Sequence, residues 1–151
     1  GDMSAVGFKF EPSPPKEERP EESKKVTIDF SDPAYLVDYQ YDRETNTYKR
    51  FNGGQPHLDA NNQTQVTPTN IIVMRAPTNP ITGGSGVLDI NVSGSGDLTV
   101  FRDGKVIQGS WEKAAPGSPL TLKDASGKII SLSPGQTWIE IVRPTTQVTI
   151  Q

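Results

Sequence analysis

The sequence predicts a mainly β fold: an antiparallel β-sandwich or partly open barrel, built of consecutive hairpins with little helix. Three observations support this prediction. Short runs of residues alternate between apolar and polar side chains, as half-buried strands do. Fourteen glycines and thirteen prolines supply many turns. No window shows a helical period, so we expect no helix longer than one or two turns.

The composition limits the classes of protein that the chain can represent. Its 151 residues fit one domain, but only 32% are apolar and the mean hydropathy is -0.54, so the core is small. A net charge of -3 gives no electrostatic footprint for nucleic acid. The absence of cysteine excludes disulfides, thiolate nucleophiles and cysteine-ligated zinc. No apolar run approaches the roughly 18 residues of a transmembrane helix.

The first 25 residues differ from the rest of the chain. The stretch EPSPPKEERPEESKK, residues 11–25, has no large apolar side chain, and Pro20 would break a helix there. We predict that residues 1–25 are the tail of a missing preceding domain plus a charged, proline-rich linker, and that residues 26–151 form a single antiparallel β domain. Phe8-Lys9-Phe10 alternates like a strand that needs a sheet edge or a neighbouring domain to cover it. No signal peptide is present, so we expect a fragment of a longer protein.

The first strands after the linker follow period two. Val26, Ile28 and Phe30 alternate with polar residues. Tyr35, Val37, Tyr39 and Tyr41 share one face of the next segment. Residues 42–46 form the loop of a hairpin that returns through residues 48–51, and Asn52-Gly53-Gly54 is a turn.

The later strands begin with residues 71–74, which are apolar on both faces and predict a central strand. Residues 88–92 predict another strand, which ends at the flexible connection 93–96. Two hairpins follow, with turns at Asp103-Gly104 and at residues 124–128. The last strands are expected at residues 138–142 and 148–150.

The stretch VFRDGKVIQGSW, residues 100–111, has two interpretations. In the first, Asp103 and Lys105 belong to a binding surface with Trp111 as a stacking platform for a sugar. In the second, Asp103-Gly104 is a hairpin turn, Lys105 is a solubilising edge charge and Trp111 anchors the core. We favour the second, because hairpin physics explains every residue.

His57 is the only histidine, and in an extended segment it would share a side with Asp59. The pair could bind a metal or act as a base with its orienting carboxylate. One histidine and one acid are not a site by themselves, so a loop histidine with local hydrogen bonds is the favoured interpretation. The serine-glycine clusters match neither a nucleophile elbow nor a dinucleotide fingerprint. We therefore predict no catalytic residue, no metal and no cofactor.

Tyrosines at period two could also line a carbohydrate groove, because stacked rings make a flat platform. Tyr35 and Tyr39 are the candidates on this face. Such a stripe is more often part of a core, so this interpretation ranks second.

Three separated blocks resemble one bacterial family. They are VDYQYDRETNTYKRFNGGQPHLDANNQTQVTPTNIIVM, GSGDLTVFRDGKVIQGSWEK and LSPGQTWIEIV. Over residues 26 to 142 the chain resembles the C-terminal domain of the YerB-like lipoproteins, a family of unknown function. The resemblance implies an extracytoplasmic protein, tethered to the membrane by a lipidated N-terminus that this chain lacks and preceded by another domain. The family has no established activity, so Arg50, His57, Asp59, Trp111 and Trp138 are pattern residues without an assigned role.

Three functions remain in competition. The leading hypothesis is a non-catalytic module of a cell-envelope lipoprotein that binds an envelope protein or scaffolds an assembly. The second is a module that binds cell-wall glycan through Tyr35, Tyr39, Trp111 or Trp138. The third is a hydrolase or metal-dependent enzyme centred on His57.

Overall fold

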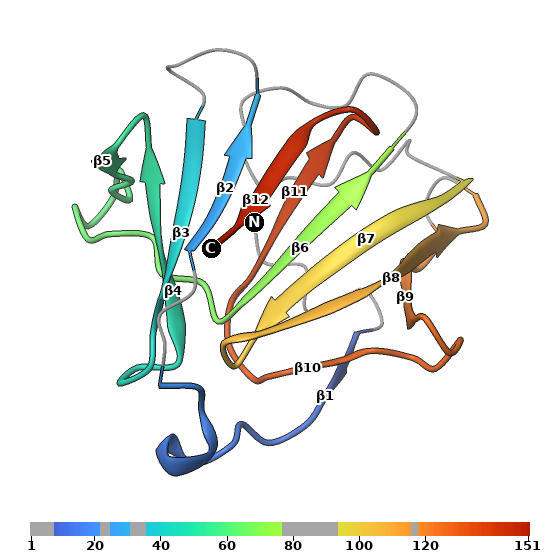
Figure 1. Ribbon diagram of the computed structural model, residues 1–151, viewed down its shortest axis with the longest axis horizontal. Helices are drawn as coiled ribbons and strands as arrows, with labels where there is room; N and C mark the ends of the chain where they lie inside the picture. Colours follow the sequence, from blue (N-terminus) through green and yellow to red (C-terminus); the bar gives the residue numbers. More distant parts are fainter. Residues whose placement is uncertain (1–7, 22–24, 31–35, 77–93, 116–117) are drawn as a thin grey trace.

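The computed structural model consists of two five-stranded sheets packed face to face and a separate two-stranded pair (Figure 1). It describes residues 8–21, 25–30, 36–76, 94–115 and 118–151. The predicted mainly β, open fold is confirmed, because the described chain is almost entirely strand and turn and neither sheet closes into a barrel. Tyr35 and the strand predicted at residues 88–92 lie outside the described residues.

In chain order the elements are β1 (Lys9–Phe10), the 3-10 helix η1 (Lys16–Glu18), β2 (Lys25–Asp29), β3 (Leu36–Asp42), β4 (Thr47–Asn52), β5 (Gln55–Pro56), β6 (Asn70–Arg75), β7 (Gly94–Arg102), β8 (Lys105–Lys113), β9 (Thr121–Asp124), β10 (Ser131–Leu132), β11 (Thr137–Val142) and β12 (Gln147–Ile150).

The first sheet is antiparallel throughout, in the order β12-β2-β3-β4-β5. Its β3–β4 hairpin is the one predicted from sequence, and it places Tyr39 opposite Arg50. The predicted alternation also holds, because Val37, Tyr39 and Tyr41 all point into the core. The sheet therefore turns one face of aromatic and aliphatic side chains toward the second sheet.

The second sheet has the order β11-β6-β7-β8-β9. Strand β6 lies inside it and is buried on both faces, as its unbroken apolar run predicts. Its pairing with β7 is antiparallel, but β11 runs parallel to β6, with Trp138 beside Ile71. The sheet is therefore mixed, and the chain leaves β6, builds the β7–β10 region and returns to the opposite side of β6.

Two hydrophobic clusters share strand β6. Ile71 and Val73 face the first sheet, whereas Ile72 and Met74 face the segment that contains β9 and β10. Fully burying one such side chain stabilises a fold by about 1.5–3 kcal/mol. The alternation along β6 therefore contributes to both cores at once and holds the two layers in register.

The Asp103-Gly104 turn is confirmed as the β7–β8 connection. Both residues have positive φ, 54° and 72°, as a two-residue hairpin loop of this type requires. The Asp103 side chain is nevertheless buried, and its Oδ1 accepts hydrogen bonds from Asn46 Nδ2 (2.8 Å) and Ser133 Oγ (2.7 Å). The turn thus also joins the β3–β4 loop to the segment after β10.

Trp111 is a core anchor, as the favoured interpretation of this stretch predicts. Its side chain is only 1% exposed, and Nε1 donates to the Arg75 carbonyl at 2.9 Å. The expected flexible connection at residues 93–96 is corrected, because Gly94–Gly96 begin β7. A side chain at Gly96 would stand 2.7 Å from Trp111 Nε1, so the glycine makes room for the indole.

Residues 8–21 lie against the β domain. Strand β1 pairs in parallel with β10, and Phe8 packs on the cluster that surrounds Trp111. The Arg19 guanidinium donates to the Arg43 carbonyl at 2.8 Å. Whether this segment connects to a preceding domain stays a prediction. In the described part of the chain, no helix has the length and apolar character needed to cross a membrane.

Candidate functional site

A buried ion pair joins the two sheets at Arg50. This residue points inward from β4 and is 1% exposed, and its Nη2 lies 3.0 Å from Oε2 of the fully buried Glu140 on β11. Its Nε donates to the Tyr39 hydroxyl at 2.8 Å and its Nη1 to Asn52 Oδ1 at 2.9 Å. A guanidinium satisfies such a set because it has five N–H donors in a fixed plane.

Tyr39 completes the ion pair by bridging it. Its hydroxyl accepts from Arg50 and donates to Glu140 Oε2 at 2.8 Å. Burial raises the pKa of Glu140, while the Arg50 charge, the Tyr39 hydroxyl and the Trp138 indole oppose that rise. Burial would lower the pKa of Arg50, but the oxygens of Tyr39 and Glu140 outweigh it and raise that pKa. The cluster is therefore an arginine held as a cation by two buried oxygen partners.

His57 lies at the outer side of this cluster. Its Nδ1 is 2.6 Å from Arg50 Nη1, and because a guanidinium can only donate, Nδ1 accepts and the ring proton sits on Nε2. Burial lowers the pKa of His57, and the Arg50 charge lowers it further, while Asp59 acts in the opposite direction. The imidazole also meets Trp138 edge to face, with ring centroids 5.9 Å apart, and the same indole lies 5.3 Å from the Arg50 guanidinium carbon.

The segment 57–66, which we call the Arg50-anchored hairpin, is attached to β4 through the backbone of Arg50. The His57 amide donates to the Arg50 carbonyl at 2.9 Å, and the Arg50 amide donates to the Val66 carbonyl at 3.1 Å. The Val66 amide closes the hairpin on the His57 carbonyl at 2.8 Å, and Gln65 Nε2 also reaches the Arg50 carbonyl. One buried residue thus fixes both the hairpin backbone and the His57 ring.

Asp59 has a local role in this hairpin. Its Oδ1 accepts the Asn61 amide hydrogen at 2.8 Å, which caps the turn in the way aspartate side chains commonly do. His57 directs Nδ1 at Arg50, so the two side chains line the same pocket without forming a histidine–carboxylate hydrogen bond. Among the described residues no group of three or more His, Cys, Asp or Glu side chains is placed to hold a metal ion.

A cavity of about 590 Å³ opens between the hairpin and β11. Its walls combine amide and hydroxyl side chains with one indole, and Leu58 stands at its rim with 48% of its surface exposed. The lining residues that supply polar or aromatic contacts are His57, Asp59, Asn61, Asn62, Thr64, Gln65, Thr67, Gln136 and Trp138. The pocket can donate and accept hydrogen bonds, and its aromatic and histidine walls keep one geometry because the buried cluster supports them.

The predicted site residues therefore separate into two groups. The structure brings Arg50, His57, Asp59 and Trp138 together at one pocket and its supporting cluster. Tyr39 and Trp111 are buried in the core, so neither ring is available to stack on a sugar, and that part of the glycan hypothesis is corrected.

Sequence reasoning missed Glu140. The signal was present, because Glu140 is the only charge in the run Trp138-Ile139-Glu140-Ile141-Val142, and a charge in a buried strand requires a partner. The partner could not be named, since it lies in the other sheet.

The fold and the pocket define a two-sheet β domain with a polar pocket that a buried ion pair supports. Residues 26–139 match the C-terminal domain of the protein family of unknown function DUF3048, and the chain belongs to this family. The chain is 32% identical over 123 residues to the protein named "Putative lipoprotein YerB" from Bacillus subtilis (strain 168), covering 80% of this chain and 36% of that protein.

The fold agrees with the crystal structure of YerB protein from Bacillus subtilis. The TM-score is 0.69 at 24% identity, over 94% of this chain and 46% of that chain. The chain therefore spans less than half the length of the relatives it matches.

Proposed function

We propose that this domain is a non-catalytic module of an extracytoplasmic bacterial lipoprotein that binds an envelope protein or scaffolds an assembly. We infer that it does so through the Arg50-anchored hairpin and the pocket beneath it. The observation that carries the proposal is the exposed Leu58 on a hairpin that a buried arginine holds in place. The name of the YerB relative supports the lipoprotein setting.

The chemistry of this surface suits a protein partner. Protein interfaces place aromatic and aliphatic contacts at the centre and polar groups at the rim. Here Leu58 and Trp138 supply the apolar contacts, and Asn61, Asn62 and Gln136 supply polar ones. The hairpin is already ordered by its hydrogen bonds to Arg50, which reduces the entropy that binding must overcome.

A wall glycan is the second candidate for the same pocket. Amide and hydroxyl side chains beside an indole are the groups that hydrogen-bond and stack on sugars, and Gln65, Thr67 and Trp138 provide them. The argument is weaker than for a protein, because Trp138 is only 8% exposed and leaves little ring surface for a sugar to stack on. A His57-centred enzyme ranks third, since Nδ1 of His57 is engaged by Arg50.

Site-specific photocrosslinking would test the leading proposal in the full-length protein in intact envelopes. A crosslinking amino acid at Leu58 is expected to give a discrete protein adduct. The matched control is the same amino acid at Ile129, which is 38% exposed between β9 and β10. Strands β5 and β9 lie on opposite sides of the molecule in Figure 1. Equal adducts at both positions, or none at Leu58, would contradict protein binding at this pocket.

Co-sedimentation with purified peptidoglycan sacculi separates the second candidate from the first. The protein proposal predicts no saturable pelleting at micromolar concentrations. Saturable pelleting that is lost on Thr67→Ala, with the melting temperature unchanged, would favour the glycan.

A further inference from the structure

Strand β12 forms one edge of the first sheet, and no strand of the described residues pairs with its outer side. Lys25 and Gln151 exchange both backbone hydrogen bonds, each at 2.9 Å. In an antiparallel ladder such hydrogen-bonded pairs alternate with pairs whose backbone N–H and C=O groups point away from the neighbouring strand. The backbone N–H and C=O groups of Val148 and Ile150 therefore point away from β2, toward the open edge. No described residue bonds to these backbone groups. An extended segment could therefore pair with β12.

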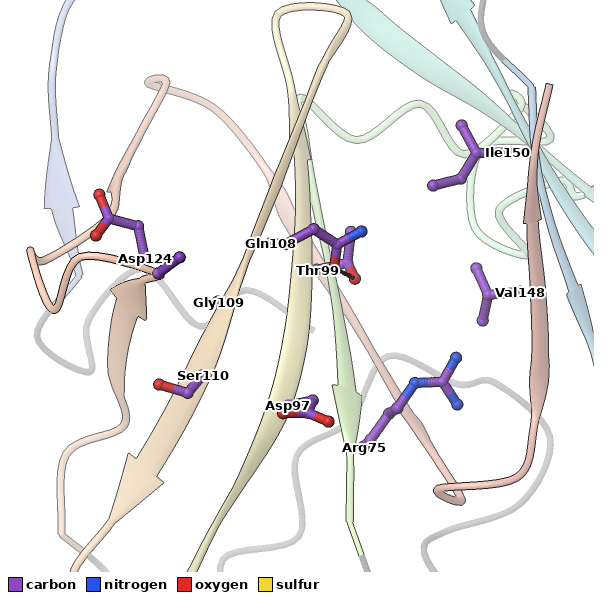
Figure 2. A pocket seen from close by; sticks show the side chains of 10 residues that line it. Arg75, Asp97, Thr99, Gln108, Gly109, Ser110, Asp124, Val148 and Ile150 are labelled. Atoms are coloured by element: carbon purple, nitrogen blue, oxygen red, sulfur yellow. Dashed lines mark hydrogen bonds between the residues drawn. The ribbon is translucent and has the colours of Figure 1, made fainter.

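The open edge overlooks a groove of about 500 Å³, which we call the β12 groove. Figure 2 shows Val148 and Ile150 pointing from β12 toward the side chains that β7 and β8 raise from the second sheet. Ile150 is 38% exposed because nothing in the described chain covers it from this side. The floor is polar, and its residues are Asp97, Thr99, Gln108 and Ser110. The groove thus has an apolar wall with free backbone groups and a hydrophilic floor.

The arrangement of the sheets limits what can occupy the groove. Strands β8 and β9 extend beyond β12, as their labels in Figure 1 and Asp124 in Figure 2 show. A second copy that paired its β12 with this β12 about a twofold axis normal to the sheet would bring its own β8 and β9 into the same layer. The two overhanging sheets would then collide. A single extended segment needs only the width of one strand, about 4.8 Å, and fits above β7 and β8.

Charge narrows the chemistry of this segment. The Asp97 carboxylate has no hydrogen-bond or ion-pair partner among the described residues, and Asp124 also lines the groove. Arg75 is the cation that lines it, and its Nη1 donates to the carbonyls of Arg143, Pro144 and Thr146 at 3.1, 3.1 and 2.7 Å. Within the described part of the chain the floor therefore offers an unpaired carboxylate, and a lysine or arginine side chain is its natural complement.

We propose that the β12 groove is a second docking surface, on which an extended segment of a partner protein adds to β12 and directs a basic side chain at Asp97. Backbone pairing supplies affinity in this mode, and the side chain over the floor supplies specificity. The surface differs from the His57 pocket in residues and in strands. It would bind even if the proposed function of that pocket failed.

Amide hydrogen exchange of the purified 151-residue chain is the first test. The amides of Val148 and Ile150 are expected to exchange freely, while those of Gln147 and Thr149, which face β2, are protected. Protection of all four amides in the monomer would show that the edge is already covered, and would overturn the proposal.

A ten-residue peptide library displayed on phage supplies the probe for the second test. Selected peptides are expected to carry lysine or arginine at alternate positions and to slow exchange at Val148 and Ile150. Ile150→Pro removes the outward N–H together with the isoleucine side chain of the groove wall, and should weaken their binding about tenfold. Asp97→Asn should reduce the affinity for these peptides severalfold. The control Asp29→Asn, at the end of β2 opposite Gln147, should leave the affinity unchanged.

Two results would overturn the proposal. Peptides that bind equally well to Ile150→Pro would place the contact elsewhere. A concentration-dependent dimer that Ile150→Pro dissociates would identify a second copy as the occupant.

Discussion

Replacing Glu140 with glutamine tests whether the buried ion pair holds the site together. The substitution keeps the shape of the side chain but removes the charge that Arg50 contacts at 3.0 Å, and both side chains are at most 1% exposed. Breaking a buried pair by removing one partner costs about 3–5 kcal/mol, because the other charge stays buried without compensation. Glutamine still offers one oxygen to Arg50 or Tyr39, so we expect a loss near the lower end, about 3 kcal/mol. That is a large part of a typical stability of about 5–15 kcal/mol.

Urea unfolding measures this loss directly. With a slope of about 1–3 kcal/mol per molar urea, the midpoint should fall by at least about 1 M. Glu112→Gln is the matched control, because it removes the same charge from an exposed pair with Lys123 at 3.5 Å, and such pairs contribute about 0–1 kcal/mol. Equal midpoints for the two variants would refute the argument that Arg50 depends on Glu140.

A second measurement shows whether the effect reaches the pocket. If the ion pair positions Arg50, then Glu140→Gln should accelerate hydrogen exchange at the His57 and Val66 amides, which belong to the hairpin anchored on Arg50. The Asp124–Lys128 turn should keep its exchange rates, because its hydrogen bonds are local. Uniform acceleration in both places would indicate a global loss of stability, and the proposed anchoring would be wrong.

Two further predictions concern pH and backbone conformation. The pKa of His57 lies below its ordinary value of 6.5, so as the pH falls below 6.5 the unfolded chain binds a proton more readily than the folded one. The contribution of neutral His57 to the free energy of unfolding is therefore complete above pH 6.5 and declines as the pH falls through the folded-state pKa. A His57→Gln variant should lack this decline. Parallel profiles of stability against pH for the two proteins would contradict the assigned His57–Arg50 contact. Gly104→Ala should cost about 1–3 kcal/mol, because Gly104 has a φ of 72° and an added methyl would lie 2.8 Å from Tyr41 Cε2. Gly127→Ala, at a φ of 86° with open space around it, should cost about 1 kcal/mol in thermal unfolding. Equal melting temperatures for the two variants would show that the contact with Tyr41 adds nothing to the cost of Gly104→Ala.

Local chemistry is what made much of the fold predictable. The Asp103-Gly104 turn and the inward face of Val37, Tyr39 and Tyr41 depend on neighbours within a few residues, and both predictions are confirmed. The parallel pairing of β11 with β6 was not predictable in this way. It joins segments far apart in the chain, and period-two patterns are the same in parallel and antiparallel strands.

The site was predictable only in part for the same reason. His57 and Asp59 could be selected from the sequence because a histidine near a carboxylate can bind a metal or act as a base, and both residues line the pocket. The group that fixes the His57 ring is Arg50, seven residues earlier on β4, and its counter-ion is on the other sheet. A single sequence shows which residues could ionise, but the tertiary fold decides which of them face each other.

The buried cluster also bears on how the pocket can work. Arg50 contacts Glu140 across the two sheets and holds the hairpin through its backbone. Its Nη1 also lies 2.6 Å from Nδ1 of His57, and this hydrogen bond restrains the imidazole ring. A ligand that rotated the His57 ring would have to break a hydrogen bond to a buried cation, whose desolvation makes any loss of partners costly. The wall formed by His57 and Trp138 is therefore held in place by the buried cluster, and under the proposed function selectivity comes from the exposed side chains of the hairpin, Leu58 above all. A buried support beneath the exposed side chains of the hairpin is the arrangement that the proposed protein-binding function requires.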